Sequence, residues 1–183
     1  MAIRTGNSTH WDFMFEKFKS ATLDSDIQKY LTALSASEDQ LILANLLNKT
    51  IDLTEIRLQD VGYIYGGLCS NKVGRHVIMD WMTNSYQDIF DTLGANTILI
   101  ASVIIDGYAG TSNTQSDIDN ITNFVHVHQS DLQSVMSSID SSLKMAHLMI
   151  DWNEMHRTTV HNWLNTNYAT TQLRGIVSFS IIS

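Results

Sequence analysis

The chain has 183 residues, of which 44% are hydrophobic, so it can bury a core as one domain. It contains a single cysteine and therefore cannot form an internal disulfide or a cysteine-cluster metal site. Eleven Lys and Arg against nineteen Asp and Glu give a net charge of -8, and no two basic residues are adjacent, which excludes nucleic acid as a partner because phosphate binding needs clustered cations. Proline is absent, which favours long uninterrupted helices.

Apolar residues recur at intervals of three and four along almost the whole chain, as is typical of amphipathic helices. The first predicted helix spans about residues 8–20, and the second includes residues 27–34. The Ser37–Gln40 segment has the pattern of a capping box and opens a third helix. Thr54 is expected to cap a fourth helix, which carries the apolar positions of residues 56–68.

Three more helices are predicted in the middle of the chain. One begins near Ser70 and ends at Gly94, whose missing β-carbon suits a left-handed terminus. The next covers Ala95 to Tyr108, and a loop with small residues follows over 107–113. Another helix contains residues 118–125.

The C-terminal stretch is apolar at helical spacing as far as Leu164. Its apolar stripe changes phase near Asp151–Glu154, where we expect one helix to end and another to begin. Residues 173–183 alternate in a β-like manner without a partner strand. The sequence therefore predicts an all-α stack of antiparallel helices in a single helical-repeat domain over 1–168, followed by a disordered tail over 169–183.

No complete catalytic or metal site can be assembled from the sequence. The seven histidines include no HExxH motif, and the pairs His126/His128 and His156/His161 have poor spacing for chelation on a helix. Cys69 lacks a catalytic motif and is interpreted as a small core residue. We therefore predict no catalytic residue, no metal site and no cofactor in this chain.

The glycines at 62, 66 and 67 match neither a dinucleotide-binding nor a P-loop motif and are assigned to close helix packing. The longest apolar run, residues 98–105, is too short to cross a bilayer, so we expect no membrane contact by this chain itself. Residues 1–6 lack the apolar run of a signal peptide. Three triplets have the pattern of N-glycosylation acceptors, about as many as chance supplies: Asn7-Ser8-Thr9, Asn48-Lys49-Thr50 and Asn120-Ile121-Thr122.

Four polar residues lie within otherwise apolar helical segments: Arg57, Gln59, Asp60 and Arg75. In one interpretation, Asp60 and the two arginines form hydrogen bonds or ion pairs between neighbouring helices. In the other, all four line a concave surface of the stack, where the planar guanidinium group of arginine suits a peptide carboxylate.

Several segments, taken in order over residues 10–165, resemble the C-terminal helical domain of the zinc aminopeptidases related to aminopeptidase N and the endoplasmic-reticulum aminopeptidases. Met79 and Tyr86 depart from the pattern, since tryptophan is common at both positions. The segments that carry the resemblance are Trp11-Asp12-Phe13, Leu31-Thr32-Ala33-Leu34, Leu46-Leu47, Ile56-Arg57-Leu58-Gln59-Asp60, Asn71-Lys72-Val73-Gly74-Arg75 with Trp81, Ile150-Asp151-Trp152, and Val160-His161-Asn162-Trp163-Leu164.

The resemblance implies a HEAT/armadillo-like superhelix of about 8 or 9 antiparallel helices, which is a fragment of a larger C-terminal domain. It further implies a non-catalytic domain that caps the catalytic domain of an aminopeptidase, or of an inactive relative, and shapes the cavity for peptide substrates. Zinc would belong to the catalytic domain of the parent protein, and the location would be extracellular or in the lumen of the secretory pathway. The alternative is a free-standing helical scaffold that binds proteins.

Overall fold

The computed structural model describes residues 3–93, 96–109 and 114–179, with the backbone alone at Tyr108 and at 168–179. Within these ranges all regular structure is helical, which confirms the predicted all-α fold. The elements are α1 (Ser8–Lys19), α2 (Asp24–Leu34), α3 (Gln40–Asp52), the 3-10 turn η1 (Leu58–Asp60), α4 (Val61–Cys69), α5 (Gly74–Asn84), α6 (Tyr86–Leu93), α7 (Thr97–Ser102), the π-helix η2 (Val103–Ala109), α8 (Gln115–Val127), the 3-10 turn η3 (Gln133–Val135) and α9 (Met136–Phe179).

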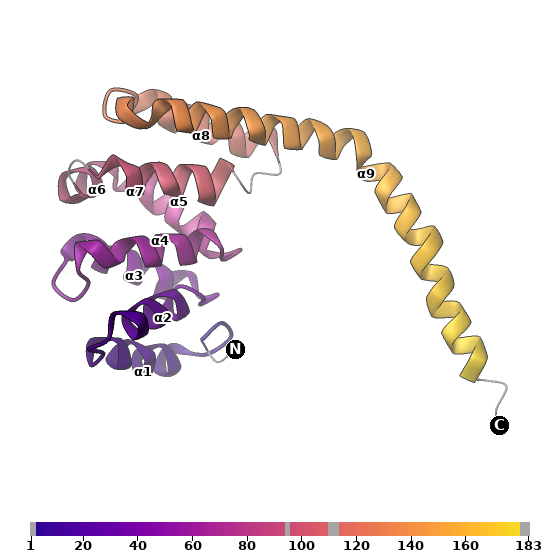
Figure 1. Ribbon diagram of the computed structural model, residues 1–183, viewed down its shortest axis with the longest axis horizontal. Coiled ribbons are helices and arrows are strands. Elements are labelled where there is room, and N and C mark those ends of the chain that lie inside the picture. Colours follow the sequence, from indigo (N-terminus) through magenta and orange to yellow (C-terminus); the bar gives the residue numbers. More distant parts are fainter. Residues whose placement is uncertain (1–2, 94–95, 110–113, 180–183) are drawn as a thin grey trace.

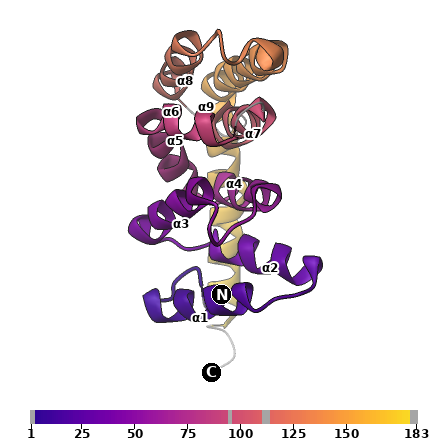
Figure 2. The ribbon, with the colours of Figure 1, turned by 90° about the vertical axis from the view of Figure 1, so that its left-hand side faces the viewer.

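The helices are stacked in chain order, with α1 at one end and α8 with the first part of α9 at the other (Figure 1). One layer is formed by successive contacts from α2 to α4, from α4 to η2 and from η2 to α9. The second layer includes α3, α5 and α6, which contact one another beside the first (Figure 2). This two-layer stack is consistent with the expected superhelix.

One hydrophobic core extends through the stack from Ile3 to Ile139. Leu31, Leu46 and Ile78, from helices α2, α3 and α5, are completely buried. Burial of an aliphatic side chain of this size stabilises the fold by about 1.5–3 kcal/mol. The core therefore follows the three- and four-residue spacing on which the helix predictions rested.

Two predicted helix starts are wrong. Helix α3 is capped by Asp39, whose carboxylate accepts hydrogen bonds from the backbone amides of Leu41 (2.9 Å) and Ile42 (3.2 Å). The Ser37 hydroxyl accepts from the amide of Asp39 instead (3.2 Å), so the capping box of Ser37 and Gln40 does not form. A carboxylate two residues closer to the helix is the better cap, because it also interacts favourably with the helix dipole.

Thr54 does not cap the fourth helix either. Its hydroxyl donates to the carboxylate of Asp52 (2.9 Å), and α4 begins only at Val61, after the turn η1. Leu53, with φ of 56°, ends α3 in the left-handed region, the one positive φ of a non-glycine residue among the described residues. The chain therefore changes direction between α3 and α4 over a longer connection than the sequence indicated.

The two long helices predicted over 70–108 are each interrupted or distorted. The first divides at Ser85 (φ −123°, ψ 22°) into α5 and α6, and this break lets Tyr86 and Ile89 enter the core. The second starts at Thr97 and widens into the π-helix η2. Gly107 lies in this π-helix rather than in the expected loop, while residues 94, 95 and 110–113 lie outside the described part of the chain.

Helix α9 continues without a break through Asp151–Glu154, so the division expected there is wrong. The segment contains no proline and no glycine between Gln129 and Tyr168, and nothing in it ends a helix. Its first part packs on α8 and η2, and its second part bends and projects away from the stack (Figure 1). The backbone of 169–179 is helical and continues α9, where the sequence predicted a disordered tail, and the domain division at residue 168 stays a prediction.

Candidate functional site

Arg57 and Asp60 form a local ion pair, three residues apart, at the turn η1 just before α4. The Nε of Arg57 donates to Oδ2 of Asp60 at 2.6 Å, and its Nη2 lies 3.4 Å from Oδ1 of Asp24 in α2. The hydrogen bond to Asp60 raises the pKa of the Arg57 guanidinium. Asp60 is buried, whereas Arg57 and Gln59 are exposed, so this end of α4 presents one cation and one amide to solvent.

Arg75 lies at the opposite end of α4, in the first turn of α5. Its side chain is half-buried, and its guanidinium makes no hydrogen bond or ion pair with the described part of the chain. The nine residues of α4 separate it from Asp60, a distance of about 13 Å along the helix axis. The four sequence candidates therefore form two separate groups rather than one site.

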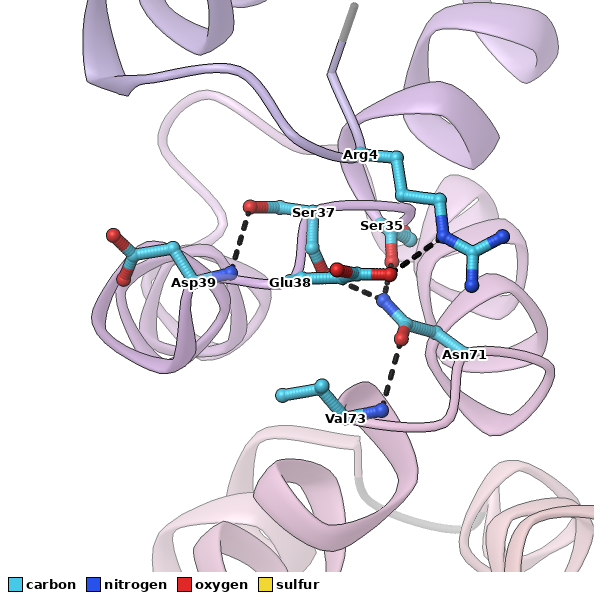
Figure 3. A network of polar contacts seen from close by, with 7 residues as sticks. All are labelled: Arg4, Ser35, Ser37, Glu38, Asp39, Asn71 and Val73. Carbon is cyan, nitrogen blue, oxygen red and sulfur yellow. Dashed lines mark hydrogen bonds and ion pairs between the residues drawn. The ribbon is translucent and has the colours of Figure 1, made fainter. Parts of the chain in front are cut away.

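Asn71, between α4 and α5, joins two turns of the stack (Figure 3). Its Nδ2 donates to the backbone carbonyls of Ser35 (2.9 Å) and Ser37 (2.6 Å), and its Oδ1 accepts from the amide of Val73 (3.0 Å). The Ser35 and Ser37 carbonyls belong to the connection between α2 and α3. Sequence reasoning included Asn71 in a motif but assigned it no role, since its partners are more than thirty residues away.

Close packing accounts for two glycines near this junction. A β-carbon on Gly74 would lie 2.8 Å from the Leu68 carbonyl oxygen, and one on Gly67 would lie 2.7 Å from Cβ of Ser35. The packing role predicted for Gly67 is therefore confirmed. Gly62 has only an ordinary contact, 3.5 Å from Leu99, and a β-carbon on Gly66 would meet nothing within 4 Å.

Gly66 instead belongs to the floor of an open groove of about 540 Å³ beside α4. The exposed ring of Tyr63 lines it, and two cations, Arg4 and Lys72, lie at its edge. Arg4 donates to Glu38 at 2.6 Å, which partly neutralises it (Figure 3). The groove offers glycine backbone, an aromatic ring and a cation. Its residues were not predicted as a group.

No cluster of three His, Cys, Asp or Glu side chains within the described residues could hold a metal ion. Cys69 is buried, as predicted for a core residue, and burial raises the pKa of its thiol to about 12. A thiol with this pKa stays protonated at neutral pH and is a poor nucleophile. The ring of His128 stacks on Tyr86, with 3.6 Å between centroids, and burial lowers the pKa of this histidine.

None of the helices, over the residues described, combines the length and the apolar character that crossing a membrane requires.

A layered stack of this kind, in which each helix packs mainly on its neighbours, is typical of helical-repeat domains. Residues 1–148 match the family model described as the ERAP1-like C-terminal domain, and the chain belongs to this family, a non-catalytic part of aminopeptidases.

Curated relatives agree with this assignment. Aminopeptidase Ey of Gallus gallus is 28% identical over 170 residues, which cover 92% of this chain and 17% of that protein. Aminopeptidase N of Oryctolagus cuniculus is 24% identical, with 92% and 17% covered, and aminopeptidase A of Gloydius brevicauda is 26% identical, with 89% and 17% covered. The chain thus spans less than one fifth of the length of these relatives.

Proposed function

We propose that this domain closes over the catalytic domain of a zinc aminopeptidase and helps to shape the cavity that holds peptide substrates. The observation that carries the proposal is the family match over residues 1–148, together with relatives that are named aminopeptidases. A rigid wall of helices around a catalytic centre selects substrates by size and orientation, because binding contacts far from the reacting bond position it for reaction. The catalytic domain is accordingly the first partner, and peptides are the second.

Arg57, Gln59, Asp60 and Arg75 are the proposed cavity residues. Asp60 holds the Arg57 guanidinium through Nε, while the contact of Nη2 with Asp24 is long and exposed. An exposed ion pair of this kind contributes little, so a peptide carboxylate can replace Asp24 at small cost. Arg75 offers a second guanidinium at the opposite end of α4.

The zinc of the proposed enzyme is assigned to the catalytic domain of the parent, as membership of the aminopeptidase family implies. An extracellular or secretory-lumen location is proposed from the family. The three acceptor asparagines, Asn7, Asn48 and Asn120, are all exposed, which suits this location. Oδ1 of Asn48 accepts from Trp81 Nε1 at 2.9 Å, which leaves Nδ2 for attachment of a glycan.

The proposal is tested on the longer polypeptide that the gene encodes, with peptides of increasing length and a single-residue aminoacyl reporter. We expect Arg75→Ala to leave reporter hydrolysis and the unfolding temperature unchanged while it alters kcat/KM for the longer peptides. Gln59→Ala and Arg57→Ala are measured with the same peptides. Arg57→Ala is expected to lower the unfolding temperature as well, because it leaves the buried carboxylate of Asp60 without its cation.

The 183-residue chain alone, supplied with zinc, should not cleave the reporter. A length profile that none of the three variants changes would contradict the assignment of these residues to the cavity. Cleavage by the isolated chain would contradict the non-catalytic role itself.

A further inference from the structure

Helix α9 carries two apolar series on different sides. Ile139, Leu143, Ala146 and Ile150 face the stack, where Ala109 of η2 and Ile118 of α8 pack with Leu143, Ala146 and Ile150. A second series, named the outer stripe, is exposed and consists of Met145, Leu148, Met149, Trp152, Met155, Val160 and Trp163.

The outer stripe follows one side of the helix, where His156 and Thr159 stand between Trp152 and Trp163. Met145, Met149 and Trp152 are spaced by four and three residues, so they lie along one side of the helix. Met149 and Ile150 are neighbours in sequence, and therefore point about 100° apart around the axis. At 1.5 Å per residue the stripe extends over about 30 Å, from the packed part of α9 into its projecting part.

The large exposed fractions are unusual for such a run: Met155 is 73% exposed and Leu148 is 61% exposed. A helix that is apolar on more than one side is typical of a position inside a protein. The phase change that the sequence showed near Asp151–Glu154 is the passage from the inner series to the outer stripe, and it does not mark a helix end.

Helix α1, at the other end of the stack, differs from α9 in the polarity of its exposed side. On α1, the outward side carries the exposed charges of Asp12, Glu16 and Lys17, with Phe13 as a single exposed large apolar residue. Helical arrays need a polar outer face on their terminal helices. The outward side of α1 has this polar character, and the outer stripe of α9 lacks it.

We propose that the outer stripe is covered by an apolar helical surface from a further part of the same, longer polypeptide, which makes α9 an interior helix. The proposal rests on the proposed function in taking this chain as one domain of a larger protein. The match to aminopeptidase Ey covers 92% of the chain, so the stripe falls within the matched segment, and 83% of that relative lies outside the match (100% − 17%).

A second copy of the chain is the weaker choice of occupant. A specific interface between separate proteins usually involves about 20–30 residues on each side, whereas the stripe offers one row on one helix. A covalently linked segment is already held at a high effective concentration, so a narrow apolar row is sufficient to dock it.

The test uses oxidation of methionine by hydrogen peroxide, in which the thioether gains one oxygen atom and the peroxide leaves as water. In the 183-residue chain we expect Met145, Met149 and Met155 to oxidise severalfold faster than Met79 and Met82, which are buried. In the full polypeptide that the gene encodes, the three stripe methionines should slow to the range of Met79 and Met82. Peptide mapping by mass spectrometry measures each rate.

A double variant tests the stripe itself. Leu148→Glu with Trp152→Lys places a glutamate four residues before a lysine, a favourable order on a helix. Because both side chains are exposed, the unfolding temperature of the 183-residue chain should not change. In the full polypeptide the variant should restore fast oxidation of Met145, Met149 and Met155, and the matched control Phe13→Glu on α1 should not.

Three results would overturn the inference. One is stripe methionines that react as fast in the full polypeptide as in the isolated chain. Another is a gene that encodes only these 183 residues. The third is a dimer of the isolated chain, seen by light scattering, that protects the stripe methionines and is lost in the double variant. If the full polypeptide has aminopeptidase activity but its stripe methionines are not protected from oxidation, only this inference is refuted. If the stripe methionines are protected but the full polypeptide has no aminopeptidase activity, only the proposed function is refuted.

Discussion

Replacement of Asn71 by alanine should destabilise the domain more than any other substitution of a half-exposed polar residue near α4. The side chain makes three hydrogen bonds, two to the carbonyls of Ser35 and Ser37 and one from the amide of Val73 (Figure 3). Each bond contributes about 0.5–1.5 kcal/mol, so their loss should cost about 2–4 kcal/mol. In a domain of this size the unfolding temperature should fall by about 5–10 °C.

Thermal unfolding of the 183-residue chain, followed by far-ultraviolet circular dichroism, measures this loss. Asn71→Asp keeps the acceptor for Val73 but removes both donors and places a carboxylate against two carbonyls, so it should destabilise at least as much as Asn71→Ala. Asn123→Ala, on the exposed side of α8, is the control and should change stability by less than about 0.5 kcal/mol. Equal unfolding temperatures for Asn71→Ala and Asn123→Ala would refute the assignment of Asn71 as a connection between the two turns.

The fold was predictable from the sequence wherever one helix face decides burial. The spacing around Leu31, Leu46 and Ile78 fixed both the helices and their buried sides. Boundaries were less certain, because neighbouring residues compete to cap a helix. Ser37 and Asp39 both have the side chain for it, and only the backbone path selects Asp39.

The candidate site was harder to predict because it depends on contacts between distant segments. The pairing of Arg57 with Asp60 is local, three residues apart, whereas sequence reasoning considered ion pairs between neighbouring helices. The bonds of Asn71 with the α2–α3 connection span 34 and 36 residues, which no local pattern encodes. The outer stripe was visible as a change of phase, but a single chain cannot show whether such a change ends a helix or opens a second apolar face.

Two further predictions concern local packing and pH. Gly67→Ala should destabilise the domain by about 1–3 kcal/mol, because its β-carbon would lie 2.7 Å from Cβ of Ser35. At Gly66 an added β-carbon would meet no atom within 4 Å, so Gly66→Ala should instead stabilise the domain by up to about 1 kcal/mol. Chemical denaturation of the two variants compares their free energies of unfolding. A loss of stability in both variants would contradict the packing argument. For His128, burial lowers the pKa in the folded state, so the unfolded chain takes up the proton first as the pH falls. This contribution to stability is intact above the ordinary pKa of about 6.5 and is lost as the pH decreases through the lower folded value. Unfolding temperatures measured from pH 7.5 to pH 5 should therefore fall less steeply in His128→Phe than in the parent chain. The control His147→Gln, at an exposed position, should keep the slope of the parent chain. Identical slopes for His128→Phe and the parent chain would show that proton uptake at His128 does not oppose folding.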